Sequence, residues 1–209
     1  MANEEFNIRY PQPGDHLIEE GGDAKTLFGD WIKGKWASYA DAYKAAADAL
    51  VDKVEGHAPE DVLVLPIVFM YRHHVELKLK YIISGLDLLS QTQMQNFITH
   101  NIVTLWNYVK VHLDCIRGGP FDADLMNSLE QLITELSSLD PNSYRFRYSH
   151  DTGFNENDIP RSINLTHFKE AMDILSNGLR LIESGIDYEK DSRAMDADFE
   201  AEMRPFMEF

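Results

Sequence analysis

The chain has 209 residues, of which 19 are Lys or Arg and 35 are Asp or Glu, so its formal net charge is −16. This length is sufficient for one domain with its own core, and the 44% hydrophobic content excludes wholesale disorder. The acidity excludes a protein whose whole surface binds nucleic-acid phosphates, and the single cysteine excludes an internal disulfide and a thiolate zinc cluster.

The first residues, which are rich in Pro, Gly and acidic side chains, predict an irregular N-terminal arm over 1–35, with a short helix near 27–33. The chain begins with neither a basic segment nor an apolar segment of the kind found in signal peptides. Its apolar runs are shorter than the roughly 20 residues that cross a bilayer. We therefore expect a soluble cytoplasmic protein with no membrane partner.

An alanine-rich stretch with a helical period predicts the first helix over 36–54, and Gly56 is expected to end it. The second helix is expected to begin at 59–61, where a proline and two acidic residues suit the first turn of a helix. Its apolar pattern continues through Leu86, with a kink predicted at Pro66.

Asn96 or Thr99 is expected to cap the third helix, which the Gly-Gly-Pro segment 118–120 ends. The fourth helix is expected to begin at Asp122 or Asp124, and an Asp-Pro-Asn sequence stops it. No segment alternates between apolar and polar residues over the length of a strand.

A polar, turn-rich loop is predicted from 141 to 164, and loops of this kind often carry function. The fifth helix is expected to begin at Asn164 or Thr166 and to end near Tyr188. An acidic tail, 189–209, follows it. The sequence thus predicts an all-α bundle of about five main helices with a long polar loop before the last helix.

The acidic charge is unevenly distributed along the chain. Residues 62–118 contain 5 basic and 3 acidic side chains, a net charge of +2, together with four of the eight histidines. The net charges of the other segments are −7 for 1–61, −6 for 119–186 and −5 for 187–209. A local site for an anion is therefore compatible with the acidic total.

Charged residues in the second helix form the first candidate site. Arg72, Glu76 and Lys80 are spaced four residues apart and share one face, and His73 flanks them. His100 begins the third helix, where the helix dipole favours an anionic partner. Two interpretations follow: a ladder of mutually paired charges on a half-exposed face, or a polar patch that lines a groove and binds a ligand. No His-x3-His spacing is present, so we expect no metal site.

The loop provides a second candidate site, in which Arg145, Arg147, Tyr148, His150 and Asp151 lie close together in the sequence. Guanidinium groups bind phosphate, tyrosine rings stack on bases and histidine transfers protons. The alternative is that the two arginines tie the loop to carboxylates of the helices.

Three segments resemble the HEPN (higher eukaryotes and prokaryotes nucleotide-binding) family. The apolar helix YRHHVELKLKYI resembles its R/H-x-x-E-x-x-L-K core helix, and THNIVTLW resembles a helix that opens with His followed by Asp or Asn. The later segment FRYSHD is similar to an arginine-tyrosine loop that precedes the last helix of the family. The resemblance covers about 36–188 and implies a helical bundle, a homodimer and no cofactor.

In many HEPN members an R-x4–6-H motif cleaves RNA without a metal, through attack by the 2′-hydroxyl. The resemblance carries this motif to Arg145 with His150, and to a second candidate pair, Arg161 with His167. Other members are non-catalytic and bind nucleotides or partner proteins, some of them in toxin–antitoxin or phage-defence systems.

Two functions from different classes therefore remain as hypotheses. The leading one is a non-catalytic or regulatory module that binds RNA, a nucleotide or a basic protein partner. The alternative is a metal-independent ribonuclease in which His150 transfers protons while Arg145 and Arg147 hold phosphate. A helical small-molecule sensor is a third interpretation.

Overall fold

The computed structural model of the chain describes Gln12 and residues 35–54, 61–94, 97–117, 121–151, 153, 155–156, 159–160 and 162–207. The chain divides into two units, Met1–Lys33 and Gly34–Phe209, and the described helices all lie in the second. Most of the predicted arm, including the short helix expected over 27–33, falls outside the described residues.

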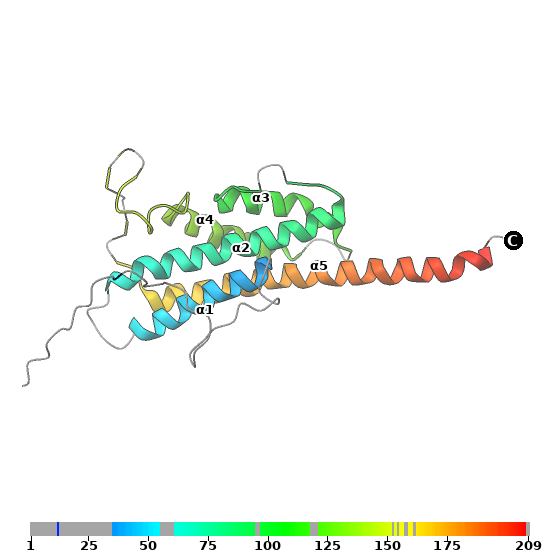
Figure 1. Ribbon diagram of the computed structural model, residues 1–209, viewed down its shortest axis with the longest axis horizontal. Helices are drawn as coiled ribbons and strands as arrows, with labels where there is room; N and C mark the ends of the chain where they lie inside the picture. The colour runs from blue at the N-terminus through cyan, green and yellow to red at the C-terminus, as the bar shows by residue number, and fades with distance from the viewer. Residues whose placement is uncertain are drawn as a thin grey trace, which may run out of the picture. The chain divides into compact units, whose positions relative to one another are not determined.

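The second unit is an all-α bundle, as the sequence predicts (Figure 1). Among the described residues there is no strand, and β pairing is confined to an isolated antiparallel bridge between His150 and Glu156. The elements are α1 (Trp36–Val54), a 3-10 turn (Asp61–Leu63), α2 (Val64–Ser90), α3 (Ile102–His112), a second 3-10 turn (Leu113–Cys115), α4 (Ala123–Leu139) and α5 (Leu165–Met207).

The bounds of α1 agree with the prediction, whereas α2 begins and ends later than expected. The 3-10 turn precedes α2, so Pro66 lies in the first turn of the α-helix. A proline there breaks no hydrogen bond, because the first N–H groups of a helix have no acceptor within it. The predicted kink at Pro66 therefore has no physical cause. The helix continues past Leu86 to Ser90, where Gln91 ends it at φ 55°.

Side-chain caps begin α3 and α4. Asn101, and not Thr99, caps α3, because its Oδ1 accepts a hydrogen bond from Thr104 N at 2.9 Å. The other predicted cap, Asn96, lies outside the described residues. Asp122 caps α4 as expected, and its Oδ1 accepts from the N–H groups of Asp124 and Leu125, in the first turn of that helix, at 2.9 and 3.1 Å.

The prediction that the last helix ends near Tyr188 is wrong, because α5 continues to Met207 and includes most of the acidic tail. Between residues 189 and 204 the sequence contains neither Gly nor Pro and is rich in Ala, Glu, Met and Arg, which favour helix. Glu189 and Arg193, four residues apart, also form an ion pair at 2.6 Å. The acidic composition of 189–209 is therefore no sign that the helix ends at Tyr188.

The core is built around α2, of which 16 of 27 residues are buried. This helix packs against α1, α3 and α5, and α4 contacts α3 and α5. Each fully buried aliphatic or aromatic side chain contributes about 1.5–3 kcal/mol to the free energy of folding. The largest fully buried side chains include Tyr71, Ile82 and Leu86 in α2, Trp106 in α3, and Leu129 and Ile133 in α4.

Within the described residues no helix has the length and apolar composition needed to cross a membrane.

Candidate functional site

Arg72 of α2 joins two segments that are distant in the sequence. Its side chain is fully buried, and its Nε donates a hydrogen bond to Asp140 O at 2.7 Å, at the C-terminal end of α4. Nη2 donates to His100 O, just before α3, and lies 3.5 Å from Pro141 O. Because Arg has five N–H donors in a rigid fork, one side chain fixes both segments against α2.

Glu76 balances the charge of this arginine. Its Oε2 accepts from Arg72 Nη1 at 3.0 Å, and its Oε1 accepts from Lys80 Nζ at 2.9 Å. Oε1 also lies 2.9 Å from His100 Nδ1. Burial alone would raise the pKa of Glu76, but hydrogen bonds and charge from Lys80 and His100 hold it below its usual value. The charges are thus mutually paired, as one of the two interpretations predicts, although the ladder is buried and not half-exposed.

The loop after α4 folds back onto Asp140. The Oδ1 atom of Asp140 accepts hydrogen bonds from the N–H groups of Tyr144 and Arg145 at 2.6 and 3.1 Å. Ser143, which precedes Tyr144, has φ 59°, in the left-handed region that non-glycine residues rarely adopt. Its carbonyl accepts from Arg147 Nε, so the arginine side chain helps to hold the strained turn. The guanidinium of Arg147 is fixed at the same time.

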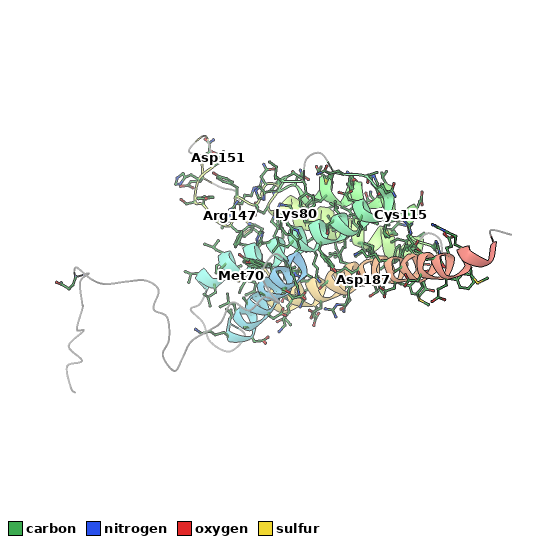
Figure 2. All side chains as sticks on the ribbon, turned by 45° about the vertical axis from the view of Figure 1, so that its right-hand side comes forward. Met70, Lys80, Cys115, Arg147, Asp151 and Asp187 are labelled. Carbon is green, nitrogen blue, oxygen red and sulfur yellow. The ribbon has the colours of Figure 1, made fainter. Side chains whose placement is uncertain are left out.

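The start of α3 and the loop after α4 line a cavity of about 620 Å³ that is open to solvent, which we call the Arg–Tyr cavity. Residues 99–101, at the start of α3, form part of its lining, and the rest comes from the loop 140–151. Arg147 lies nearer the helices, and Asp151 lies toward the outer end of the loop (Figure 2). From the loop, Asp140, Tyr144, Arg145, Arg147, Tyr148 and Asp151 contribute to the lining.

Arg147 lies among aromatic rings at this cavity. Its Cζ is 5.4 Å from the ring centre of Phe69, 5.7 Å from that of Tyr144 and 5.5 Å from that of Tyr148. The two tyrosine rings lie 4.5 Å apart. A guanidinium held in this way retains a charge for phosphate, and exposed tyrosine rings offer faces on which a base can stack.

His100 opens onto the same cavity. Its side chain is 58% exposed, whereas the carboxylate of Glu76 that bonds its Nδ1 is 1% exposed. A buried carboxylate that orients an accessible imidazole is an arrangement used for proton transfer. The sequence suggested His100 as a ligand-binding residue, and the structure adds this second capacity.

Arg145 and His150, the first R-x4–6-H candidate, have different surroundings: Arg145 bonds the end of α4, and His150 lines a second cavity. Arg145 Nη1 donates to the last carbonyls of α4, Ser138 O at 3.1 Å and Leu139 O at 3.4 Å. This contact favours the alternative that the arginine ties the loop to the bundle, through backbone carbonyls and not carboxylates. His150 lines a second cavity of about 340 Å³, which Arg145 also borders, and its Nδ1 lies 2.8 Å from Ser149 Oγ.

Two further predicted residues, His73 and His167, do not line the Arg–Tyr cavity. His73 packs between Phe69 and Tyr43, with ring centres 5.6 and 4.5 Å away, and burial lowers its pKa. His167, in the first turn of α5, borders a cavity of about 180 Å³ beside the C-terminal end of α4. Arg161, its partner in the second R-x4–6-H candidate, lies outside the described residues.

Sequence reasoning missed the role of Asp140. This residue was expected only to stop α4, because an Asp-Pro pair is a common end signal. Its buried carboxylate lies 4.0 Å from Nε of Arg72, which is 68 residues earlier in the chain, and no local pattern reports this contact.

Comparison with known proteins finds no matching family model, no matching curated protein and no matching solved structure. In the described part of the chain, no group of three His, Cys, Asp or Glu side chains is placed to hold a metal ion.

Proposed function

We propose that the chain is a cytoplasmic HEPN-like helical module that binds nucleotide units, free or within single-stranded RNA, in the Arg–Tyr cavity. One observation carries the proposal: Arg147 lies among aromatic rings at the wall of this cavity. A cation for phosphate and tyrosine faces for a base are the two parts of a nucleotide site that needs no sequence-specific contacts.

The rest of the cavity suits the same ligand. Asp151 and Asn101 add oxygen and amide groups that can bond ribose hydroxyls or the edge of a base. Arg72 holds the two walls in place from within the core, so the site is rigid before a ligand arrives. The net charge of −16 opposes extended binding of nucleic acid, which leaves a small phosphate site as the form of binding that the charge permits.

Calorimetry and fluorescence anisotropy with AMP and a short labelled single-stranded RNA test this proposal. Arg147→Ala and Tyr148→Ala should each weaken binding about tenfold, since stacking is worth about 1–3 kcal/mol per base. Arg180→Ala, which removes an exposed arginine of α5, is the matched control and should bind like the wild type. Equal loss in all three variants, or no binding of either ligand, would reject the proposal.

RNA cleavage is a second candidate, which the pairing of His100 with Glu76 favours. In this reaction His100 would take the proton of the 2′-hydroxyl, whose oxygen attacks phosphorus while Arg147 holds the phosphate. The bond from phosphorus to the 5′-oxygen would break, with that oxygen taking a proton from water, and a 2′,3′-cyclic phosphate would remain. An assay in EDTA should then show cleavage that His100→Ala abolishes and that His150→Ala and His167→Ala preserve. Absence of cleavage by the wild type, with nucleotide binding intact, would leave the binding proposal alone.

A further inference from the structure

The outer face of α5 carries a regular row of exposed apolar side chains. Ile174, Leu181, Tyr188 and Met195 are spaced by seven residues, and their exposed fractions range from 56% to 72%. Seven residues are close to two helical turns, so these side chains lie on one side of the helix. We call this row, together with the exposed residues Phe199 and Met203 that extend it, the α5 stripe.

The α5 stripe is distinct from the face that α5 buries in the bundle. That face consists of Met172, Leu175, Leu179, Ile182 and Ile186, all of which are buried. Farther along, Arg193 donates hydrogen bonds to Leu89 O at 2.6 Å and to Cys115 O at 2.8 Å. Beyond this arginine, residues 194–204 are exposed, and this part of α5 extends past the other helices (Figure 1).

Length and charge define what fits the stripe. From residue 174 to residue 203 the helix rises about 44 Å, at 1.5 Å per residue. Acidic side chains border the apolar row on both sides, and the segment from residue 187 to the end has 3 basic and 8 acidic residues, a net charge of −5. Asp187, at the start of this segment, is labelled in Figure 2. The bordering carboxylates are Asp191 and Asp198 on one side and Asp196 and Glu200 on the other.

We propose that the α5 stripe binds a basic amphipathic helix of another protein. Apolar residues at heptad spacing pack against a partner helix, and the charges that flank them select the partner. A second copy of α5 would bring like charges together, −5 against −5, so charge complementarity favours a basic occupant. This site is separate from the Arg–Tyr cavity and does not depend on the function proposed for it.

A pair of synthetic peptides tests the proposal with the full chain. Each has about four heptads with Leu and Ile at the inner positions, and the flanking positions are Lys in one peptide and Glu in the other. We expect the Lys peptide to bind with a micromolar Kd by fluorescence anisotropy, and to bind about tenfold more weakly in high salt. The proposal fails if neither peptide binds or if the Glu peptide binds as well.

Variants of the chain test whether the Lys peptide binds at the α5 stripe. Tyr188→Ser combined with Met195→Ser should weaken binding of the Lys peptide at least about tenfold and leave the circular dichroism spectrum unchanged. Leu88→Ser removes an equally exposed leucine from α2 and should bind like the wild type. Unchanged binding by the double variant overturns the assignment to α5.

Light scattering of the chain without peptide separates the two kinds of occupant. The proposal predicts that the double variant and the wild type have the same mass. A wild-type dimer that the double variant converts to a monomer would identify a second copy as the occupant and overturn the basic-partner proposal.

Discussion

At the scale of single residues, Arg72 controls both the stability of the bundle and the shape of the cavity. Its guanidinium bonds a carbonyl 28 residues away and another 68 residues away. The sequence predicted that Arg72, Glu76 and Lys80 share a face, because helical spacing is a local property. The bonds of Arg72 to the two cavity walls depend on backbone carbonyls of distant segments, which leave no pattern in the sequence.

Replacing Arg72 by Met should lower the free energy of unfolding by about 3–5 kcal/mol, because the buried carboxylates of Glu76 and Asp140 would lose the guanidinium that lies beside both of them. Urea unfolding measures this change. Arg180→Met, at an exposed position of α5, should change the stability by less than about 0.5 kcal/mol. A loss below about 1 kcal/mol for Arg72→Met would contradict the role assigned to this residue.

His74 should make the stability sensitive to mild acid. Burial lowers its pKa to about 4, and its ring nitrogens bond Ala40 O at 2.9 Å and Ser176 Oγ at 3.2 Å. The unfolded chain takes up a proton near the ordinary histidine pKa of about 6.5, whereas the folded chain does not until about pH 4. Stability that is present at neutral pH is therefore lost between these two values, by about 2 kcal/mol at pH 5.

The comparison of wild type with His74→Gln isolates this contribution. Glutamine can bond the same two oxygens but has no charge to acquire. Urea unfolding at pH 7 and pH 5 should show that the variant loses about 2 kcal/mol less than the wild type between the two pH values. The same loss in both proteins would show that His74 does not control the acid response.

At the scale of elements, the approach of α4 to α5 depends on Gly178. A Cβ at this position would lie 2.6 Å from Leu129 Cδ2 and 3.2 Å from its Cγ. Leu129 is only 2% exposed and has little room to move. Helix propensity alone would make alanine about 1 kcal/mol better than glycine, but overpacking costs about 1–3 kcal/mol.

Gly178→Ala should therefore bring no gain in stability, and a loss of up to about 2 kcal/mol, in thermal or urea unfolding. Combining it with Leu129→Ala should cost less than the sum of the two single changes, since the smaller side chain removes the clash. Additive effects in this double-mutant cycle would contradict a direct contact between the two helices at Gly178.

The helix ends show which elements a sequence can predict. The start of α4 was found because Asp122 is a local cap, and α1 was found because its composition and period agree. The end of α5 was missed because net charge was taken as a sign of disorder, although the same residues favour helix. A helix that ends at Tyr188 leaves out Met195, Phe199 and Met203, the C-terminal part of the α5 stripe.

At the scale of the whole molecule, the charge of −16 limits how the proposed site can meet RNA. Phosphates outside the Arg–Tyr cavity would lie near an acidic protein, so they should add no affinity. Binding would then involve one or two phosphates, near Arg147 and Arg145. Each phosphate neutralised on a single strand contributes about −0.7 to the slope of log K against log salt.

We therefore expect a three-nucleotide RNA and one of about 20 nucleotides to bind a single site with Kd values per three-nucleotide register within about threefold, and salt slopes no steeper than about −1.4. Anisotropy titrations at several salt concentrations measure both quantities, with Arg147→Ala as the variant that should flatten the slope. Affinity that rises steadily with length, or a slope steeper than about −3, would mean that RNA follows a surface outside the cavity. In that event the cavity residues would not define the binding site, because the acidic faces of the bundle would have to contact phosphate as well.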